Sequence, residues 1–161
     1  MNRFWKIVEW TLEKLKVGGA ACLVGMSLLT CIDVVGRFFR HPILGSVELV
    51  GFMATLSVAM ALPYTHQVKA HIGVEILVRL FSERIQIIID LCTNILSFLL
   101  FAIITWRMTV YARTIQESGE RSINLKLPEY FIMYAVAFCL LIFALIILQD
   151  IGITFKKLKT K

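Results

Sequence analysis

Four long stretches of apolar residues occupy most of this chain, separated by shorter segments that hold the charges. They run roughly from Val17 to Ile32, Leu49 to Tyr64, Ile85 to Trp106 and Tyr130 to Leu148. A helix needs about 20 mainly apolar residues to cross a hydrocarbon layer about 30 Å thick. The third and fourth stretches reach that length, and the first two reach it with their neighbouring residues. The pattern predicts an all-α membrane protein.

The predicted transmembrane helices cover roughly residues 17–36, 47–65, 85–107 and 129–149. The segments between them are short, so the chain is expected to form a single domain, residues 1–161, in which the four helices make a bundle. Residues 1–16 alternate apolar and charged positions, and they either lie on the membrane or continue into the first span. Ser46 is a plausible N-cap for the second span.

The connection between the second and third spans is too apolar for a plain loop and too short and charged to cross the membrane. One helical face would hold its apolar residues, Ile72, Ile76, Leu77, Leu80 and Phe81. The opposite face would hold Glu75, Arg79 and Glu83, with Glu75 and Arg79 in the favourable i,i+4 order. This pattern predicts an amphipathic helix at about residues 72–83 that lies in the membrane interface.

Composition supports the membrane interpretation and bounds the function. The chain of 161 residues is 58% hydrophobic, too apolar for an ordinary soluble domain, and has no room for a large catalytic domain. Its net charge of +6 could suggest that it binds nucleic acid, but the basic residues lie between and beyond the spans, where they can set the orientation in the membrane. Eleven Lys and Arg residues fall on the side of the termini and six on the other side. The positive-inside rule therefore favours both termini in the cytoplasm, with the first span retained as an anchor.

Side chains that usually carry chemistry are poorly placed for it. The four cysteines fall within apolar spans without a C-x-x-C pair, which favours small apolar fillers over metal or redox roles. His41, His66 and His71 lie in connections or at a span end, which argues against axial haem ligands. No G-x-S-x-G, H-E-x-x-H or P-loop pattern is present. We expect neither an enzyme nor a metal site.

Charged residues near the ends of the first two spans form the first candidate site. Asp33 and Arg37 are four residues apart, and Glu48 opens the second span across a short turn. We interpret them as an ion network that pins this hairpin at the non-cytoplasmic end, with Arg37 and Glu48 paired directly. A docking surface or an ion path is the functional alternative, because a charge near hydrocarbon is costly and often functional.

The second candidate site is a polar face of the third span. Asp90, Asn94 and Ser97 follow one another at i, i+4 and i+7, and Thr105 continues the face. Polar side chains can join helices in lipid, typically by about 0.6 kcal/mol for each hydrogen bond. Helix packing is the favoured interpretation, and proton or ion handling is the alternative.

The segment between Asp33 and Ile76 contains D-V-V-G-R-F-F-R-H-P, S-V-E-L-V-G-F and H-I-G-V-E-I. Pro128 lies in L-K-L-P-E-Y-F, where it fits the first turn of the fourth span. In their order and spacing these motifs resemble the small membrane subunit of tripartite ATP-independent periplasmic (TRAP) transporters, the DctQ-like family. The family positions correspond to Arg37, Pro42, Glu48, His71, Val74 and Glu75. Phe52, Met53 and Ala59-Met60-Ala61 replace the tryptophans and the Leu-Gly pair that the family often has in span two.

The resemblance implies an accessory subunit of a sodium-coupled importer in the bacterial inner membrane. In such a system a periplasmic binding protein delivers an organic acid, and the large membrane subunit carries the transport and sodium sites. The small subunit would scaffold the large one without binding substrate. No cofactor is expected in this chain, although a bound phospholipid would be compatible with it. Its partners would be the large subunit, the binding protein and lipids, with no nucleic acid.

Other membrane roles stay open at this point. A small four-span exporter would need a carboxylate deep in the first span, but Asp33 lies near its end. A respiratory membrane anchor conflicts with the placement of the histidines. A membrane anchor or scaffold subunit of another complex is the remaining alternative.

Overall fold

The computed structural model describes residues 3–68 and 82–160, and every regular element in these ranges is a helix. The helices are α1 (Arg3–Phe38), α2 (Ser46–Gln67), α4 (Glu83–Ser118) and α5 (Tyr130–Thr160). All four are long and apolar enough to cross a membrane, as the sequence predicts. The predicted interfacial helix at 72–83 lies almost wholly outside the described residues, and so do His71 and Glu75.

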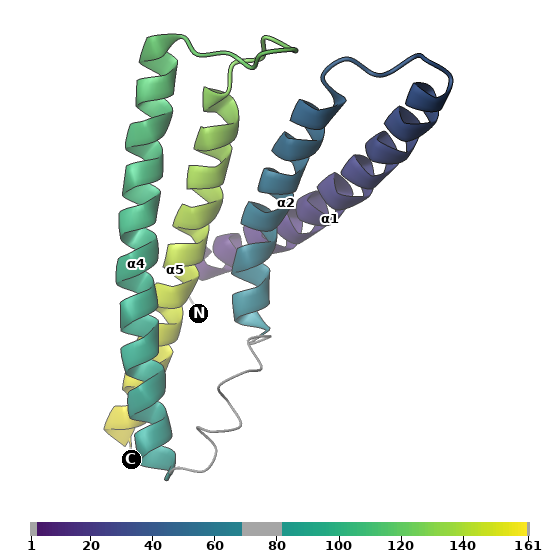
Figure 1. Ribbon diagram of the computed structural model, residues 1–161. Helices are drawn as coiled ribbons and strands as arrows, with labels where there is room; N and C mark the ends of the chain where they lie inside the picture. Colours follow the sequence, from purple (N-terminus) through teal and green to yellow (C-terminus); the bar gives the residue numbers. More distant parts are fainter. Residues whose placement is uncertain (1–2, 69–81, 161) are drawn as a thin grey trace.

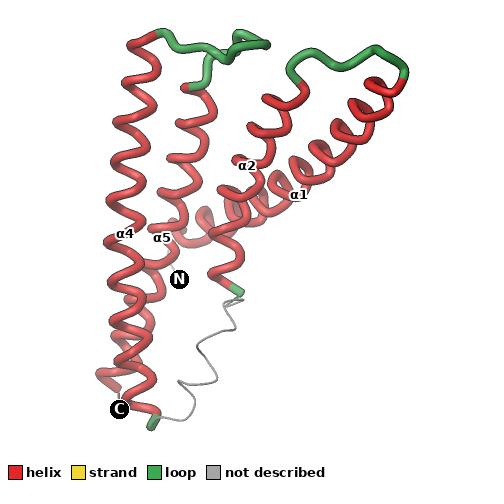
Figure 2. The backbone as a smooth tube through the Cα atoms, viewed as in Figure 1, coloured by secondary structure: helices red, strands yellow, loops and turns green. Residues whose placement is uncertain are grey.

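The helices form two antiparallel pairs that meet where α2 packs against α5 (Figure 1). In one pair α4 and α5 lie side by side over most of their length, and in the other α1 packs on α2. Figure 2 shows α1 leaning away from the other helices toward the loop that joins it to α2. The core is centred on α5, whose residues Cys139, Ile142, Phe143 and Ile147 are almost completely buried.

The first helix is much longer than the predicted span of 17–36. Residues 3–16 belong to α1 and do not form a separate surface element, because Val8, Leu12 and Leu15 are buried in the same core cluster as residues of α5. With 36 residues α1 is about 54 Å long, well beyond the thickness of a hydrocarbon layer. Such a helix must tilt or extend past the bilayer.

The third span is longer than the sequence predicts. We expected it to stop near residue 107, with a polar connection from Tyr111, but α4 continues to Ser118. Ala112 and Ile115 are buried, and Gln116 accepts a hydrogen bond of 3.0 Å from the Tyr134 hydroxyl of α5. Packing against α5 thus stabilises helix in a segment whose exposed positions are polar.

Two loops meet at one end of the molecule, which we call the rim. The first rim loop, residues 39–45, joins α1 to α2, and the second, residues 119–129, joins α4 to α5. Pro128, expected in the first turn of α5, lies two residues before that helix and bridges to Arg121 within the second loop. In Figure 1 the last turn of α5 lies at the end opposite the rim, whereas α1 begins level with the middle of α5, so both ends of the described chain lie away from the rim.

Candidate functional site

The first rim loop is held by a single carboxylate on α1. Asp33 is buried, and its Oδ1 accepts a hydrogen bond of 2.9 Å from the backbone N–H of Ile43. Its Oδ2 accepts a 2.7 Å bond from Nε of Arg37, one helical turn further along α1. The buried side chain of Ser46 also interacts with this carboxylate. Asp33 therefore connects the end of α1 to the loop and to the start of α2.

A second carboxylate, from the first turn of α2, holds the second rim loop. Glu48 accepts hydrogen bonds from the hydroxyl of Ser122, from the backbone N–H of Leu125 at 3.1 Å, and from Asn124. Asn124 donates twice, through its backbone N–H and its side-chain Nδ2, each at 2.9 Å. We call this contact the Glu48 clasp. It joins two segments that are 74 to 77 residues apart in the chain.

Local backbone geometry makes the Glu48 clasp possible. The second loop closes on itself, with the Ser122 N–H donating to Leu127 O and the Lys126 N–H donating to Ser122 O, both at 3.0 Å. These bonds leave the N–H groups of Asn124 and Leu125 directed at Glu48. Gly45, just before α2, has a left-handed φ of 78° and would hold any larger side chain against Leu125. Glycine is therefore required where the two loops touch.

The expected pair between Arg37 and Glu48 is wrong. Arg37 binds Asp33 on its own helix, while Glu48 binds the second rim loop, a segment that the sequence interpretation left out of the network. The N-cap assignment of Ser46 also fails, because Gly45 occupies the cap position and no side chain caps α2. The pairing of Arg37 with Glu48 fails because each side chain has closer partners. Backbone N–H groups of the loops offer the carboxylates closer donors than a side chain across the hairpin.

This arrangement predicts the outcome of two double-mutant cycles. Alanine at Asp33 and at Arg37 should have non-additive effects on thermal unfolding of the purified chain, because these side chains share a bond. Alanine at Arg37 and at Glu48 should have additive effects, because they do not. Asp33→Ala should also cost more than Arg37→Ala, since Arg37 is largely exposed and exposed ion pairs contribute little. Strong coupling between Arg37 and Glu48 would contradict the structure.

The end away from the rim contains a contact that sequence reasoning missed. Nε2 of His66 on α2 lies 3.3 Å from Oδ2 of Asp150 on α5, and the His66 ring packs edge-on against Phe143. Nearby, Lys16 of α1 donates a 3.2 Å hydrogen bond to the Tyr64 hydroxyl of α2. The alternating direction of successive spans could have suggested this contact, because it places the last turns of α2 and α5 on the same side of the bundle.

The polar face predicted on the third span is present on α4 but is not gathered into a site. Asp90 is exposed and Asn94 is partly exposed, and within the described part of the chain neither bonds to another helix. The Thr105 hydroxyl donates to Phe101 O of its own helix at 2.7 Å, which satisfies it locally. Across residues 3–68 and 82–160, no three His, Cys, Asp or Glu side chains are grouped to hold a metal ion.

These observations define a small four-span membrane protein whose polar side chains tie its helices and loops together. A comparison with protein families matches residues 26–156 to the family described as tripartite ATP-independent periplasmic transporters, DctQ component. The chain belongs to this family, and it is the small membrane component of a TRAP transporter. The matched segment contains both carboxylates and both rim loops. A comparison with curated proteins found no match.

Proposed function

We propose that this chain is the static, accessory membrane subunit of a sodium-coupled TRAP importer of an organic acid. It packs against the large membrane subunit and holds it in the bilayer, while a periplasmic binding protein delivers the substrate. Substrate and sodium bind in the large subunit. This chain needs no cofactor of its own, and phospholipid fills the gaps along its apolar faces.

The carrying observation is that the two carboxylates at the rim, Asp33 and Glu48, already accept hydrogen bonds from the protein itself. Asp33 and Glu48 receive hydrogen bonds from loop backbone and side chains, which leaves them suited to fixing helices and not to binding a solute. Substrate sites in secondary transporters are typically built from interrupted helices. Here the four described helices are continuous, and α2 runs through Pro63 without a break.

The orientation is part of the proposal. The excess of Lys and Arg in the segments away from the rim supports both termini in the cytoplasm of a bacterium. The rim then faces the periplasm. The second rim loop carries exposed Glu120, Arg121 and Lys126, as expected of a segment in water and within reach of a binding protein.

Transport assays in liposomes test this assignment. Vesicles that contain this chain alone should show no uptake of any organic acid under a sodium gradient, whereas vesicles that also contain the large subunit and the binding protein should. Affinity purification of this chain from its native membrane should recover the large subunit in equal amount. Substrate uptake by the chain alone would contradict a scaffold role, and purification without the large subunit would contradict the proposed assembly.

A further inference from the structure

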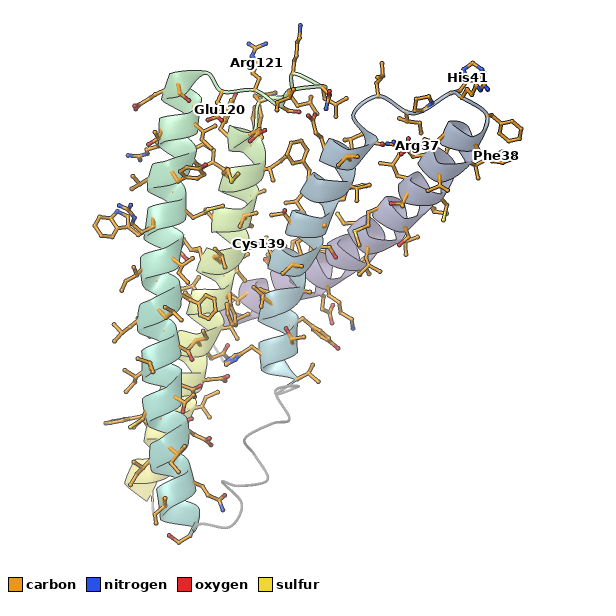
Figure 3. All side chains as sticks on the ribbon, viewed as in Figure 1. Arg37, Phe38, His41, Glu120, Arg121 and Cys139 are labelled. Atoms are coloured by element: carbon orange, nitrogen blue, oxygen red, sulfur yellow. The ribbon has the colours of Figure 1, made fainter. Side chains whose placement is uncertain are left out.

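The first rim loop carries large apolar side chains that the rest of the chain leaves uncovered. Phe38 is 83% exposed and Leu44 is 85% exposed, and Phe39 is also exposed. The rings of Phe38 and Phe39 pack edge-on with their centroids 5.4 Å apart. In Figure 3, Phe38 points away from α2 at the very end of α1. A pair of aromatic rings at the tip of a membrane helix needs a partner of its own.

The charge around these rings is basic and uncompensated. No Asp or Glu lies between Val34 and Val47, while Arg40 and His41 are exposed on the loop. Arg37 is already paired with Asp33, which leaves Arg40 as the available cation. Arg40 holds a left-handed φ of 63°, and the His41 N–H bonds to Gly36 O at 2.8 Å, so the loop turns tightly back on α1. Apolar rings beside a cation match the boundary between acyl chains and lipid phosphates.

The length of α1 allows this tip to reach that boundary. From Trp10 to Phe38 the helix covers 29 residues, or about 42 Å along its axis. A bilayer is about 40–45 Å thick with its headgroups and about 30 Å without them, so a tilted helix of this length reaches from one interface to the other. Trp10 is exposed at the far end with the Lys14 ammonium over its ring. The same pairing of aromatic and basic side chains thus occurs at both ends of α1.

Exposed apolar side chains also continue from the loop into the last turns of α1. Ile32, Val34 and Val35 of α1 are more than half exposed, as lipid-facing residues are. The second rim loop is different, because most of its exposed residues are polar or charged, with Ile123 and Leu127 as the apolar side chains among them. The two loops at the rim are therefore suited to different surroundings, the first to lipid and the second to water.

We propose that the first rim loop is a membrane anchor, with Phe38, Phe39 and Leu44 inserted among the headgroups of the rim-side leaflet and Arg40 bound to lipid phosphate. The partner of this surface is the bilayer and not another protein. Anchors at both interfaces set the depth of α1. The α1–α2 hairpin is then fixed to the membrane independently of the contacts that α2 makes with α5.

Tryptophan fluorescence tests the insertion directly. Phe39→Trp places a reporter on the first rim loop, and Ile123→Trp places a matched reporter on the second, at a side chain that is 90% exposed. Each variant is reconstituted with the large subunit in phosphatidylcholine and phosphatidylglycerol vesicles, and the signal of the unsubstituted complex, which contains Trp5, Trp10 and Trp106, is subtracted. Quenching by lipids brominated near the headgroup is compared with quenching by aqueous iodide.

The ratio of bromolipid quenching to iodide quenching should be severalfold higher for the reporter at position 39 than for the reporter at position 123. Equal ratios would show that the loop lies in water and would overturn the proposal. A reporter at 39 that neither quencher reaches would show that a protein partner covers it, which also overturns the proposal. So would loss of bromolipid quenching when the binding protein is added. The readout does not use transport, so it stays informative if the chain has another role in the complex.

Discussion

Glu48→Ala is expected to release the second rim loop from α2. The substitution removes one carboxylate that accepts hydrogen bonds from Ser122, Asn124 and Leu125, and leaves these donors without their acceptor. The loop then opens more often, and trypsin should cut after Arg121 and Lys126 severalfold faster in the purified chain. The melting temperature should fall as well. Glu48→Gln should fall between the wild-type chain and Glu48→Ala, because its amide keeps one acceptor oxygen but turns a donor toward the loop.

The matched control is Glu117→Ala, which removes the same charge from an exposed position in the last turn of α4. This control should leave both the cleavage rate and the melting temperature near those of the wild-type chain. If Glu117→Ala and Glu48→Ala accelerate cleavage equally, net charge at the rim matters and the Glu48 clasp does not. Unchanged cleavage in Glu48→Ala would show that the loop is held by other contacts.

Gly19→Val is expected to force α1 away from α2. Gly19 is buried where the two helices cross, and a Cβ built there lies 3.3 Å from Met60 Cβ and 3.3 Å from Ser57 O. The Ser57 hydroxyl donates a 2.9 Å hydrogen bond to Gly19 O across this contact. Small residues allow such close approach of helices in lipid. Overpacking typically costs about 1–3 kcal/mol, so a clear loss of thermal stability should follow, with less large subunit recovered in co-purification.

Gly51→Val provides the comparison for this experiment. Gly51 is also a glycine inside a helix, but a Cβ there meets nothing within 4 Å. The change in intrinsic helix propensity is the same at both positions, so the difference between the variants isolates the packing contact. Equal losses in the two variants would mean that the α1–α2 crossing tolerates a larger side chain, contrary to the structure.

Both contacts suit a subunit that must keep its shape. The Glu48 clasp ties the α4–α5 loop to the first turn of α2, and the close crossing at Gly19 ties α1 to the middle of α2. The His66–Asp150 contact adds a link between α2 and α5 away from the rim. The static role that we propose for this chain requires such contacts, because they hold the two helix pairs in fixed positions.

The sequence predicted the four helices because crossing a membrane imposes a length and an apolar composition that can be read directly. The predicted range for the second span, 47–65, agrees closely with α2 at Ser46–Gln67. The family motifs around Arg37 and Glu48 also pointed to the correct family. Asp33 and Glu48 were also selected from the sequence as candidate site residues, since carboxylates at the ends of apolar spans stand out from their surroundings.

The partners of those carboxylates could not be predicted in the same way. Glu48 bonds to Asn124, which is 76 residues away, and nothing in the composition of the second rim loop distinguishes it from an ordinary polar connection. The predicted end of the third span was wrong for a related reason. Residues 111–118 were predicted to be part of a polar connection, but Ala112 and Ile115 are buried where α4 packs against α5.

By itself, then, the sequence determined that this chain has four helices able to cross a membrane and which charged residues lie near their ends, because transfer of apolar and charged groups into lipid depends on local composition. The tertiary structure decided how far the helices extend, which donors the carboxylates bind and which rim loop stays apolar. Those outcomes depend on the distance between atoms that lie far apart in the chain, and a hydrogen bond or a packing contact is decided within a few tenths of an ångström.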